Sequence, residues 1–394
     1  MIVNNKNYIE RDLKSKFIKL SNTYKIIAII GARQSGKTTF LKEKIGSSEI
    51  GYISFDDPDI RQMFEEDVKK FENQYLKKLT ILDEVHYCKD AGLKLKYLAD
   101  KGYKLWLTSS SEAILSKDVL SYLVGRVTIL KMYPFSLKEF LESRNQKEIN
   151  SNILKRFILE HAVYGGYPAV VLNSDLEIKK TILGDLYQTM ILKDIARTFS
   201  INDLDSLEKF VQYLSFNIGK MISYENLSSN LNLSFQTIKK YLDAMKKSYL
   251  IHEVKPFYKN KSKELTKQPK IYFVDLGLRN FIQRDFPRVL DGEVFENYVL
   301  TEFLKMNLEP KYWRTKSKAE VDFVLEKSSK QIIPIEVKLN PRNINSGLRN
   351  FIENYSPKIA FIVNYEGINK IEKVGICKVI FTDIFQLPKH LGKL

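Results

Sequence analysis

The sequence predicts an α/β protein of several domains, with a phosphate-binding core in its amino-terminal part. A glycine-rich loop, Gly31–Thr38, follows the apolar run Lys25–Ile30 and precedes residues that can begin a helix. A second apolar run ends in the carboxylates Asp83 and Glu84, 46 residues after Lys37. With 394 residues, the chain is long enough for roughly two or three domains.

The loop has the pattern G-x-x-x-x-G-K-T, which is typical of a nucleotide-binding P-loop. Its glycines let the backbone turn so that N–H groups and a helix N-terminus face phosphate oxygens. Lys37 is expected to reach the β- and γ-phosphates, and Thr38 to ligate Mg²⁺. A chance match is the alternative, which the flanking strand and helix disfavour. We therefore predict an ATP site formed by Gly31, Arg33, Gln34, Ser35, Gly36, Lys37, Thr38 and Thr39.

The segment Leu79–Glu84 is an apolar strand followed by two carboxylates, as in a Walker B motif. Asp83 would hold Mg²⁺ through its water shell, and Glu84 would orient the attacking water. An acidic strand end facing solvent is the alternative. The spacing from Lys37 favours the catalytic interpretation.

A further strand, Lys104–Ser111, ends in hydroxyl side chains. In P-loop ATPases with an additional central strand, such a polar end helps to place the water. We assign this role to Ser110, although Thr108 or Ser109 would serve as well. A helix N-cap is the alternative role for a serine here.

Two arginines are candidates for sensing the γ-phosphate. Arg126 precedes the strand Val127–Leu130 and would supply positive charge in its own subunit or in a neighbour's. Arg197, in the helical region that follows, is the second candidate. An ordinary ion pair is the alternative for both.

Composition favours an anionic partner. The net charge is +16, with 44% hydrophobic and 28% charged residues, and nucleic acid is the first candidate for such a chain. A general bias toward lysine is the alternative explanation.

The remaining composition predicts a cytoplasmic protein. Cys88 and Cys377 are far apart in sequence, as expected of a chain in a reducing compartment. The first residues are polar, unlike a signal peptide, and no apolar run approaches the roughly 20 residues that cross a bilayer. We expect no membrane association.

Together these segments resemble the AAA-type ATPases that carry a DUF4143 C-terminal region. The resemblance covers nearly the whole chain and implies an AAA-type core over residues 1–150, and an oligomer in which a neighbour's arginine completes the site. One departure is Ser109, where the family usually has glycine, so the sensor position is open. The matching segments are G-x-R-Q-x-G-K-T, Ser54–Pro58, Leu82–Val85, Leu107–Ser110, Gly125–Arg126, Tyr133–Phe140 and Gly165–Pro168.

The middle of the chain predicts a helical lid over residues 151–205 and a winged helix-turn-helix over residues 206–270. Helices would begin after Ser223 and Ser234, and Leu250–Tyr258 would form a hairpin arm. From Lys239 to Lys270 there are ten lysines and three acidic residues, a local charge of +7. We expect recognition of the DNA backbone or shape, with domain packing as the alternative. The candidate DNA contacts are Gln236, Lys239, Lys240, Lys255, Lys259 and Lys261.

Residues 271–394 predict a PD-(D/E)xK nuclease-like α/β domain. Glu296 lies on a predicted helix, Asp322 on a strand, and Glu336 and Lys338 on one face of the next strand. Asp322 and Glu336 would hold Mg²⁺, Lys338 would orient a water, and Glu296 would complete the metal shell. Cross-strand ion pairs look the same in a sequence, and such domains can bind DNA without cutting it, so cleavage is left open.

We therefore expect an enzyme that hydrolyses ATP with Mg²⁺ and acts on duplex or branched DNA. One alternative is a DNA-independent, ATP-driven switch that remodels a protein partner. Another is a nuclease for which ATP is only regulatory.

Overall fold

The computed structural model describes residues 8–43, 50–110, 119–146, 148–258, 262, 264, 267–328 and 331–392. The chain forms two compact units, each assembled from separate stretches of sequence. The first comprises Met1–Phe135, Gln188–Ser200 and Lys247–Tyr249. The second comprises Ser136–Tyr187, Ile201–Lys246 and Leu250–Leu394. The predicted mixed α/β class is confirmed, with one large sheet in each unit.

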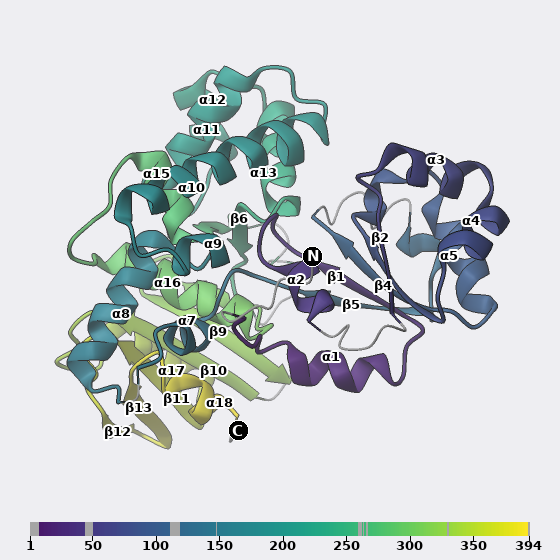
Figure 1. The fold of residues 1–394 in the computed structure, drawn as a ribbon. Coiled ribbons are helices and arrows are strands. Elements are labelled where there is room, and N and C mark those ends of the chain that lie inside the picture. The colour runs from purple at the N-terminus through teal and green to yellow at the C-terminus, as the bar shows by residue number, and fades with distance from the viewer. Residues whose placement is uncertain are drawn as a thin grey trace. The chain divides into compact units, whose positions relative to one another are not determined.

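The first unit is built on a five-stranded sheet in the order β2-β3-β4-β1-β5, whose neighbouring strands are all parallel (Figure 1). The apolar sequence of β1 leaves all five of its residues buried, as expected for the interior of a parallel sheet. β4 lies between β1 and β3, where an additional central strand was expected. The carboxyl ends of these three strands therefore meet at one edge. The elements are α1 (Lys14–Ser21), β1 (Ile26–Ile30), α2 (Lys37–Lys42), β2 (Ile50–Ser54), α3 (Pro58–Glu66), α4 (Val68–Tyr75), β3 (Leu79–Asp83), η1 (Val85–Tyr87), α5 (Ala91–Asp100), β4 (Lys104–Ser109), η2 (Leu120–Tyr122) and β5 (Val127–Lys131).

An aromatic contact fixes α1 against this sheet. The ring of Phe17 meets Phe40 of α2 at 5.2 Å and Trp106 of β4 at 4.9 Å between centroids, both edge to face. All three rings are buried and belong to one hydrophobic cluster. The helix after the P-loop is thereby held by the core as well as by its own hydrogen bonds.

Two short segments from the middle of the chain also belong to the first unit. The first contains a π-helix, η3 (Met190–Arg197), whose residues Met190 and Ile195 are fully buried. The second contains Ser248, whose hydroxyl donates a hydrogen bond to the Asp194 carbonyl at 3.0 Å. The helical region predicted as a lid over residues 151–205 is therefore divided between the two units.

The second unit begins with helices that are interrupted, as predicted, at Gly165–Pro168. A side chain at Gly165 would place its Cβ 2.1 Å from an Asp275 oxygen, and Asp275 accepts a hydrogen bond from the Gly166 amide at 2.8 Å. The break is thus tied to a later helix. The helices are α7 (Leu137–Ser143), α8 (Ser151–Tyr164), α9 (Pro168–Val171), α10 (Leu176–Thr189), α11 (Leu204–Phe216), α12 (Tyr224–Leu231), α13 (Phe235–Lys247), α15 (Leu276–Gln283), α16 (Gly292–Lys305), α17 (Ser346–Tyr355) and α18 (Leu387–Leu391).

Helices α12 and α13 begin where their serine caps predict. The Ser223 hydroxyl accepts a hydrogen bond from the Asn226 amide at 3.4 Å, and the Ser234 hydroxyl accepts one from the Thr237 amide at 3.1 Å. The predicted hairpin arm over Leu250–Tyr258 is present as one strand of an antiparallel ladder, and not of a tight hairpin. Only β6 (Ile251–Val254) is a strand there, and its antiparallel partner is β7 (Lys270–Phe273). Pro256 has no amide hydrogen and cannot continue the ladder into a tight hairpin.

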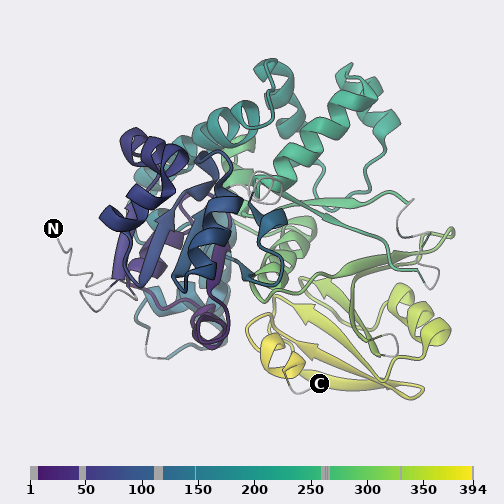
Figure 2. The ribbon, with the colours of Figure 1, turned by 90° about the vertical axis from the view of Figure 1, so that its right-hand side faces the viewer.

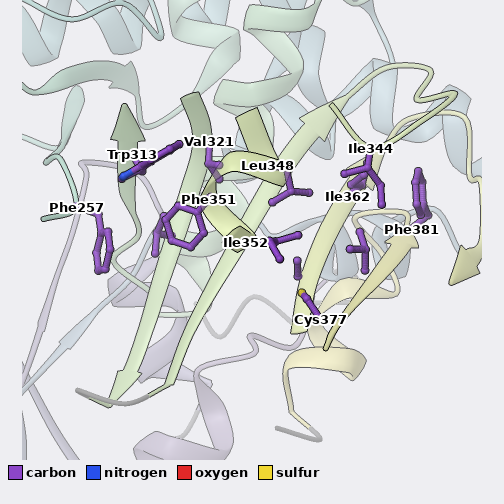
Figure 3. Close-up of a cluster of buried hydrophobic side chains, with 13 residues drawn as sticks. Phe257, Trp313, Val321, Ile344, Leu348, Phe351, Ile352, Ile362, Cys377 and Phe381 are labelled. Carbon is purple, nitrogen blue, oxygen red and sulfur yellow. The ribbon is translucent and has the colours of Figure 1, made fainter. Parts of the chain in front are cut away.

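The second unit also contains a mixed six-stranded sheet in the order β12-β13-β11-β10-β9-β8 (Figure 2). β10 pairs antiparallel with β9 and parallel with β11. Leu348, Phe351 and Ile352 of α17 pack over this sheet in a buried cluster (Figure 3). The strands are β8 (Lys311–Arg314), β9 (Glu320–Ser328), β10 (Gln331–Lys338), β11 (Ile359–Asn364), β12 (Lys370–Val374) and β13 (Cys377–Thr382).

Within the described ranges, none of the helices is long and apolar enough to span a bilayer.

Candidate functional site

The P-loop turns sharply between β1 and α2. Gln34 has a φ of 58° and Gly36 a φ of 95°, and Gly36 is the residue that precedes the first turn of α2. Gly31 lies against the neighbouring chain so closely that a Cβ there would be 1.9 Å from the Met132 carbonyl oxygen. The first and last glycines of the pattern are therefore required, one by a contact and one by backbone conformation.

Lys37 is buried in the curve of the loop, with 4% of its surface exposed. Its ammonium group donates hydrogen bonds to the carbonyl oxygens of Gly31 at 3.0 Å and Ala32 at 2.9 Å. Burial lowers the pKa of Lys37, against the opposing effect of the Glu84 charge. The ammonium is held where the loop curls, which is the place expected for phosphate contacts.

Asp83, at the end of β3, is surrounded by hydroxyl groups. Its carboxylate accepts hydrogen bonds from Thr38 at 2.9 and 3.1 Å, from Tyr52 at 2.7 Å and from Thr108. Only 6% of Asp83 is exposed. The structure thus brings together the Thr38 and Asp83 side chains that were predicted to share Mg²⁺.

Glu84 occupies a left-handed backbone conformation with a φ of 54°. One of its carboxylate oxygens accepts a hydrogen bond from the Ser110 amide at 3.3 Å and lies 3.1 Å from His86 Nδ1. Burial acts to raise the pKa of Glu84, but the His86 contact and the Lys37 charge outweigh it and lower the pKa to about 2. The carboxylate therefore remains ionised at neutral pH.

Two hydroxyls at the end of β4 have different surroundings. The Thr108 hydroxyl donates to Asp83 and accepts from the Glu84 amide at 2.9 Å, so it links both carboxylate residues. The Ser110 hydroxyl is buried and has no hydrogen-bond partner among the described residues. Ser110, the predicted sensor, thus contributes its backbone N–H to Glu84, whereas Thr108 supplies the hydroxyl contacts.

Arg126 lies away from the P-loop. It immediately precedes β5 at the amino edge of the parallel sheet, where its carbonyl accepts a hydrogen bond from the Ile26 amide at 3.2 Å. The P-loop follows the opposite edge, about 16 Å away along a five-residue strand. Arg126 instead forms an exposed ion pair with Asp100 at 2.8 Å. The prediction that Arg126 acts on the γ-phosphate of its own subunit is therefore wrong.

Two contacts to the P-loop were not anticipated. The Arg33 guanidinium pairs with Asp194 of η3 at 3.0 Å, and Asp194 is 5% exposed. Buried Arg11 donates hydrogen bonds to the Ser35 carbonyl at 2.7 Å and to the Tyr133 carbonyl at 2.6 Å. No local pattern signals a partner 161 residues away. Arg197, the other predicted sensor, is exposed at the end of η3.

The second unit brings together the strand members of the predicted nuclease-like site. Lys338 Nζ lies 2.7 Å from Glu336 Oε1 and 3.9 Å from Asp322 Oδ2. Asp322 and Glu336 are 7% and 3% exposed. Burial, together with their mutual repulsion, raises the pKa of Asp322, and burial raises that of Glu336. Two enclosed carboxylates thus share one ammonium group.

Glu296 belongs to the same electrostatic cluster but has its own partners. It accepts hydrogen bonds from Lys270 of β7 at 3.1 Å and from the Tyr272 hydroxyl. Lys270 also pairs with Glu320 at 2.5 Å and is 3% exposed. No local pattern marks Lys270 or Tyr272 as site residues, because the sequence of β7 indicates only a connecting strand.

One buried atom of this cluster is unsatisfied. Glu336 Oε2 has no hydrogen-bond partner among the residues that the structure describes, whereas Oε1 accepts from Asn345 at 2.5 Å. In the described part of the chain, no three His, Cys, Asp or Glu side chains converge closely enough to hold a metal ion. The cluster therefore has two carboxylates, Asp322 and Glu336, that could bind a cation together. Glu296 is hydrogen-bonded to Lys270.

The predicted DNA contacts that the structure describes are exposed. Gln236, Lys239 and Lys240 lie on α13, and Lys255 follows β6; all four line one cavity. Lys259 and Lys261 lie outside the described residues.

Family models match three successive parts of the chain. Residues 23–141 match the family model described as an AAA domain, and residues 291–381 match the domain of unknown function DUF4143. The chain belongs to the AAA-type P-loop ATPases that carry a DUF4143 region. In this AAA-type ATPase, residues 155–288 also match a further domain of unknown function, DUF8612. The AAA match includes the P-loop and Asp83, and the DUF4143 match includes Glu296, Asp322, Glu336 and Lys338.

Two relatives match nearly the whole length of this AAA-type ATPase. An uncharacterized protein of Haemophilus influenzae is 26% identical, with 96% of this chain and 98% of the relative covered. An uncharacterized protein of Methanocaldococcus jannaschii is also 26% identical, with 92% and 87% covered. Among solved structures, the Walker-type ATPase of Pyrococcus abyssi is similar at a TM-score of 0.47 and 14% identity, covering 70% of this chain and 96% of that chain.

Proposed function

We propose that the first unit hydrolyses ATP with Mg²⁺ and that the second unit binds DNA, so that nucleotide turnover acts on bound DNA. The observation that carries the first part is the contact of Asp83 with Thr38 and Thr108 beside buried Lys37. These residues are those that a P-loop site requires for phosphate and metal.

The residues present fit the nucleotide and the metal. Thr38 and Asp83 already share hydrogen bonds at 2.9 and 3.1 Å, so their oxygens converge where a cation and its water shell would lie. Bound Mg²⁺ would neutralise charge on the β- and γ-phosphate oxygens. Lys37 would exchange its two carbonyl partners for phosphate oxygens. Backbone N–H groups of Gly31–Thr39 would complete the phosphate contacts.

Glu84 would orient and polarise the attacking water. The Ser110 amide and His86 hold the carboxylate, and its low pKa keeps it ready to accept hydrogen bonds at neutral pH. Thr108 would fix the spacing between Glu84 and Asp83, because it contacts both residues. For the γ-phosphate arginine, we propose Arg197, or Arg126 acting on a neighbouring subunit of an oligomer.

DNA binding by the second unit is supported by exposed Gln236 and by the exposed basic residues Lys239, Lys240 and Lys255 around α13. The order of α11, α12 and α13, followed by the β6–β7 ladder, is compatible with a winged helix-turn-helix. Lysines at such positions bind phosphates, and their binding is sensitive to salt.

A second candidate activity is Mg²⁺-dependent cleavage of DNA at Asp322, Glu336 and Lys338. It is favoured by the unsatisfied, buried Glu336 Oε2, since an enclosed carboxylate oxygen without a partner is suited to a cation. Lys338 would turn from the carboxylates toward the scissile phosphate. Glu296, which is hydrogen-bonded to Lys270, would complete the metal shell. The sheet order around β9, β10 and β11 is compatible with the PD-(D/E)xK arrangement.

The experiment that tests this proposal measures ATP turnover with Mg²⁺ in the presence of single-stranded, duplex, forked and four-way DNA. The same DNA is then examined on a gel. Lys37→Ala should abolish turnover, and one DNA form should raise turnover by the parent protein. Strand breaks that disappear with Lys338→Ala but persist with Lys37→Ala would establish the nuclease.

If turnover ignores every DNA and no DNA binds, the DNA part of the proposal fails. A DNA-independent, ATP-driven switch acting on a protein partner would then be the better description.

A further inference from the structure

A cavity of about 630 Å³ lies in the second unit between α13 and the chain around β6 and β7. Gln236, Lys239 and Lys240 of α13 form one wall. The opposite wall includes Lys255 and Lys267. The exposed polar side chains of α13 therefore line this cavity. A recognition helix that enters the DNA major groove must instead present these side chains on a projecting ridge.

The charge of this cavity favours an anionic ligand. The described residues of its lining include five lysines and three acidic residues. Two of the acids are already paired, because Glu253 binds Lys246 at 2.8 Å and Glu264 binds Lys311 at 2.6 Å. Exposed Lys239, Lys255 and Lys267 have no ion-pair partner among the described residues. Lysines on facing walls can hold a phosphate backbone from two sides.

An aromatic pair lies at the N-terminal end of α13 beside this cavity. Tyr224 lines the cavity, and its ring contacts Phe235 at 4.8 Å between centroids, with a 44° tilt. Phe235 is 57% exposed, although its residue type is among those most often buried. An exposed aromatic ring beside a basic channel is a surface on which an unpaired base can stack.

The size of the cavity fits an unpaired nucleotide. A volume of about 630 Å³ suits a ligand of small-molecule dimensions, such as a base with its sugar and phosphate. In a duplex the bases are paired and stacked on one another, so no base would be free to stack on Tyr224 or Phe235. We propose that this cavity receives an unpaired strand of nucleic acid, with a base against Tyr224 and Phe235 and phosphates against Lys239, Lys255 and Lys267. This inference deepens the proposed function and rests on its DNA-binding part.

The test compares a fluorescein-labelled 15-nucleotide oligo(dT) with a 15-base-pair duplex, using fluorescence anisotropy of the full chain. We expect the single strand to bind about tenfold more tightly than the duplex. Phe235→Ala should weaken single-strand binding about 5- to 100-fold, the range found for loss of one stacking contact, and should change duplex binding little. Tyr224→Ala is a second variant with the same expected effect.

Phe216→Ala is the matched control, because Phe216 is 54% exposed on α11 of the same unit and does not line the cavity. It should leave both affinities unchanged. Equal or tighter binding of the duplex, or equal effects of Phe235→Ala and Phe216→Ala, would overturn the single-strand site while leaving DNA binding itself intact. If neither DNA binds, both the inference and the DNA part of the proposed function fail.

Discussion

Thr108, and not the predicted sensor Ser110, has the hydroxyl that contacts both Walker B residues. Its hydroxyl connects Asp83 with the Glu84 amide, whereas the Ser110 hydroxyl is buried without a partner in the described part of the chain. Thr108→Val keeps the shape of the side chain and removes both hydrogen bonds. We expect kcat for ATP to fall about 10- to 100-fold with little change in KM, since an orienting contact is lost. Ser110→Ala should retain nearly full turnover. If Ser110→Ala lowers kcat more than Thr108→Val does, Ser110 is the sensor after all.

Asp322 illustrates a residue whose charge costs stability. Burial, and after it the repulsion from the neighbouring Glu336 charge, raises the pKa of Asp322. Asp322→Asn removes one of the two charges while its amide oxygen can still accept the 2.8 Å hydrogen bond from the Val337 amide. In metal-free buffer the variant should therefore be more stable, by about 1 kcal/mol in free energy of unfolding, as is common when a strained functional carboxylate is neutralised.

Urea denaturation measures this gain. The matched control is Glu320→Gln on the same strand, because Glu320 pairs with Lys270 at 2.5 Å and Arg314 at 3.2 Å and is stabilised by both. Glu320→Gln should not raise the stability. A loss of stability in Asp322→Asn would mean that its charge is compensated by Lys338.

At the scale of elements, local patterns predicted much of the fold. The apolar run of β1, the serine caps of α12 and α13, and the glycine break after α8 each depend on neighbours within a few residues. Pairings between distant segments were beyond such patterns. The β6–β7 ladder and the contact of Arg33 with Asp194 join segments that are distant in sequence. Such contacts depend on the tertiary fold, which no local periodicity encodes.

The junction of β1 and the P-loop provides a test at this scale. Because a Cβ on Gly31 would lie 1.9 Å from the Met132 backbone oxygen, Gly31→Ala forces β1 and the chain after β5 apart. We expect a loss of about 3 kcal/mol or more in free energy of unfolding, and weak nucleotide binding. Gly102→Ala is the control, since Gly102 has a φ of 99° and open space around it, so only backbone strain of about 1 kcal/mol applies. Similar losses in both variants would show that the contact with Met132 is unimportant.

At the scale of the whole molecule, the lysines proposed for ATP hydrolysis and for DNA binding differ in their exposure to solvent. Lys37 in the first unit is 4% exposed, whereas Lys239, Lys240, Lys255 and Lys267 in the second unit are exposed and add to a net charge of +16. Salt screens exposed charges strongly and buried ones weakly. Raising salt from about 50 to 200 mM should therefore weaken single-strand binding about 50-fold, if four phosphates are contacted, and change DNA-free ATP turnover by less than about twofold. Anisotropy and a phosphate-release assay measure the two quantities on one sample. A parallel fall of both with salt would mean that the exposed lysines also serve the nucleotide site, and would contradict the assignment of the two activities to separate units.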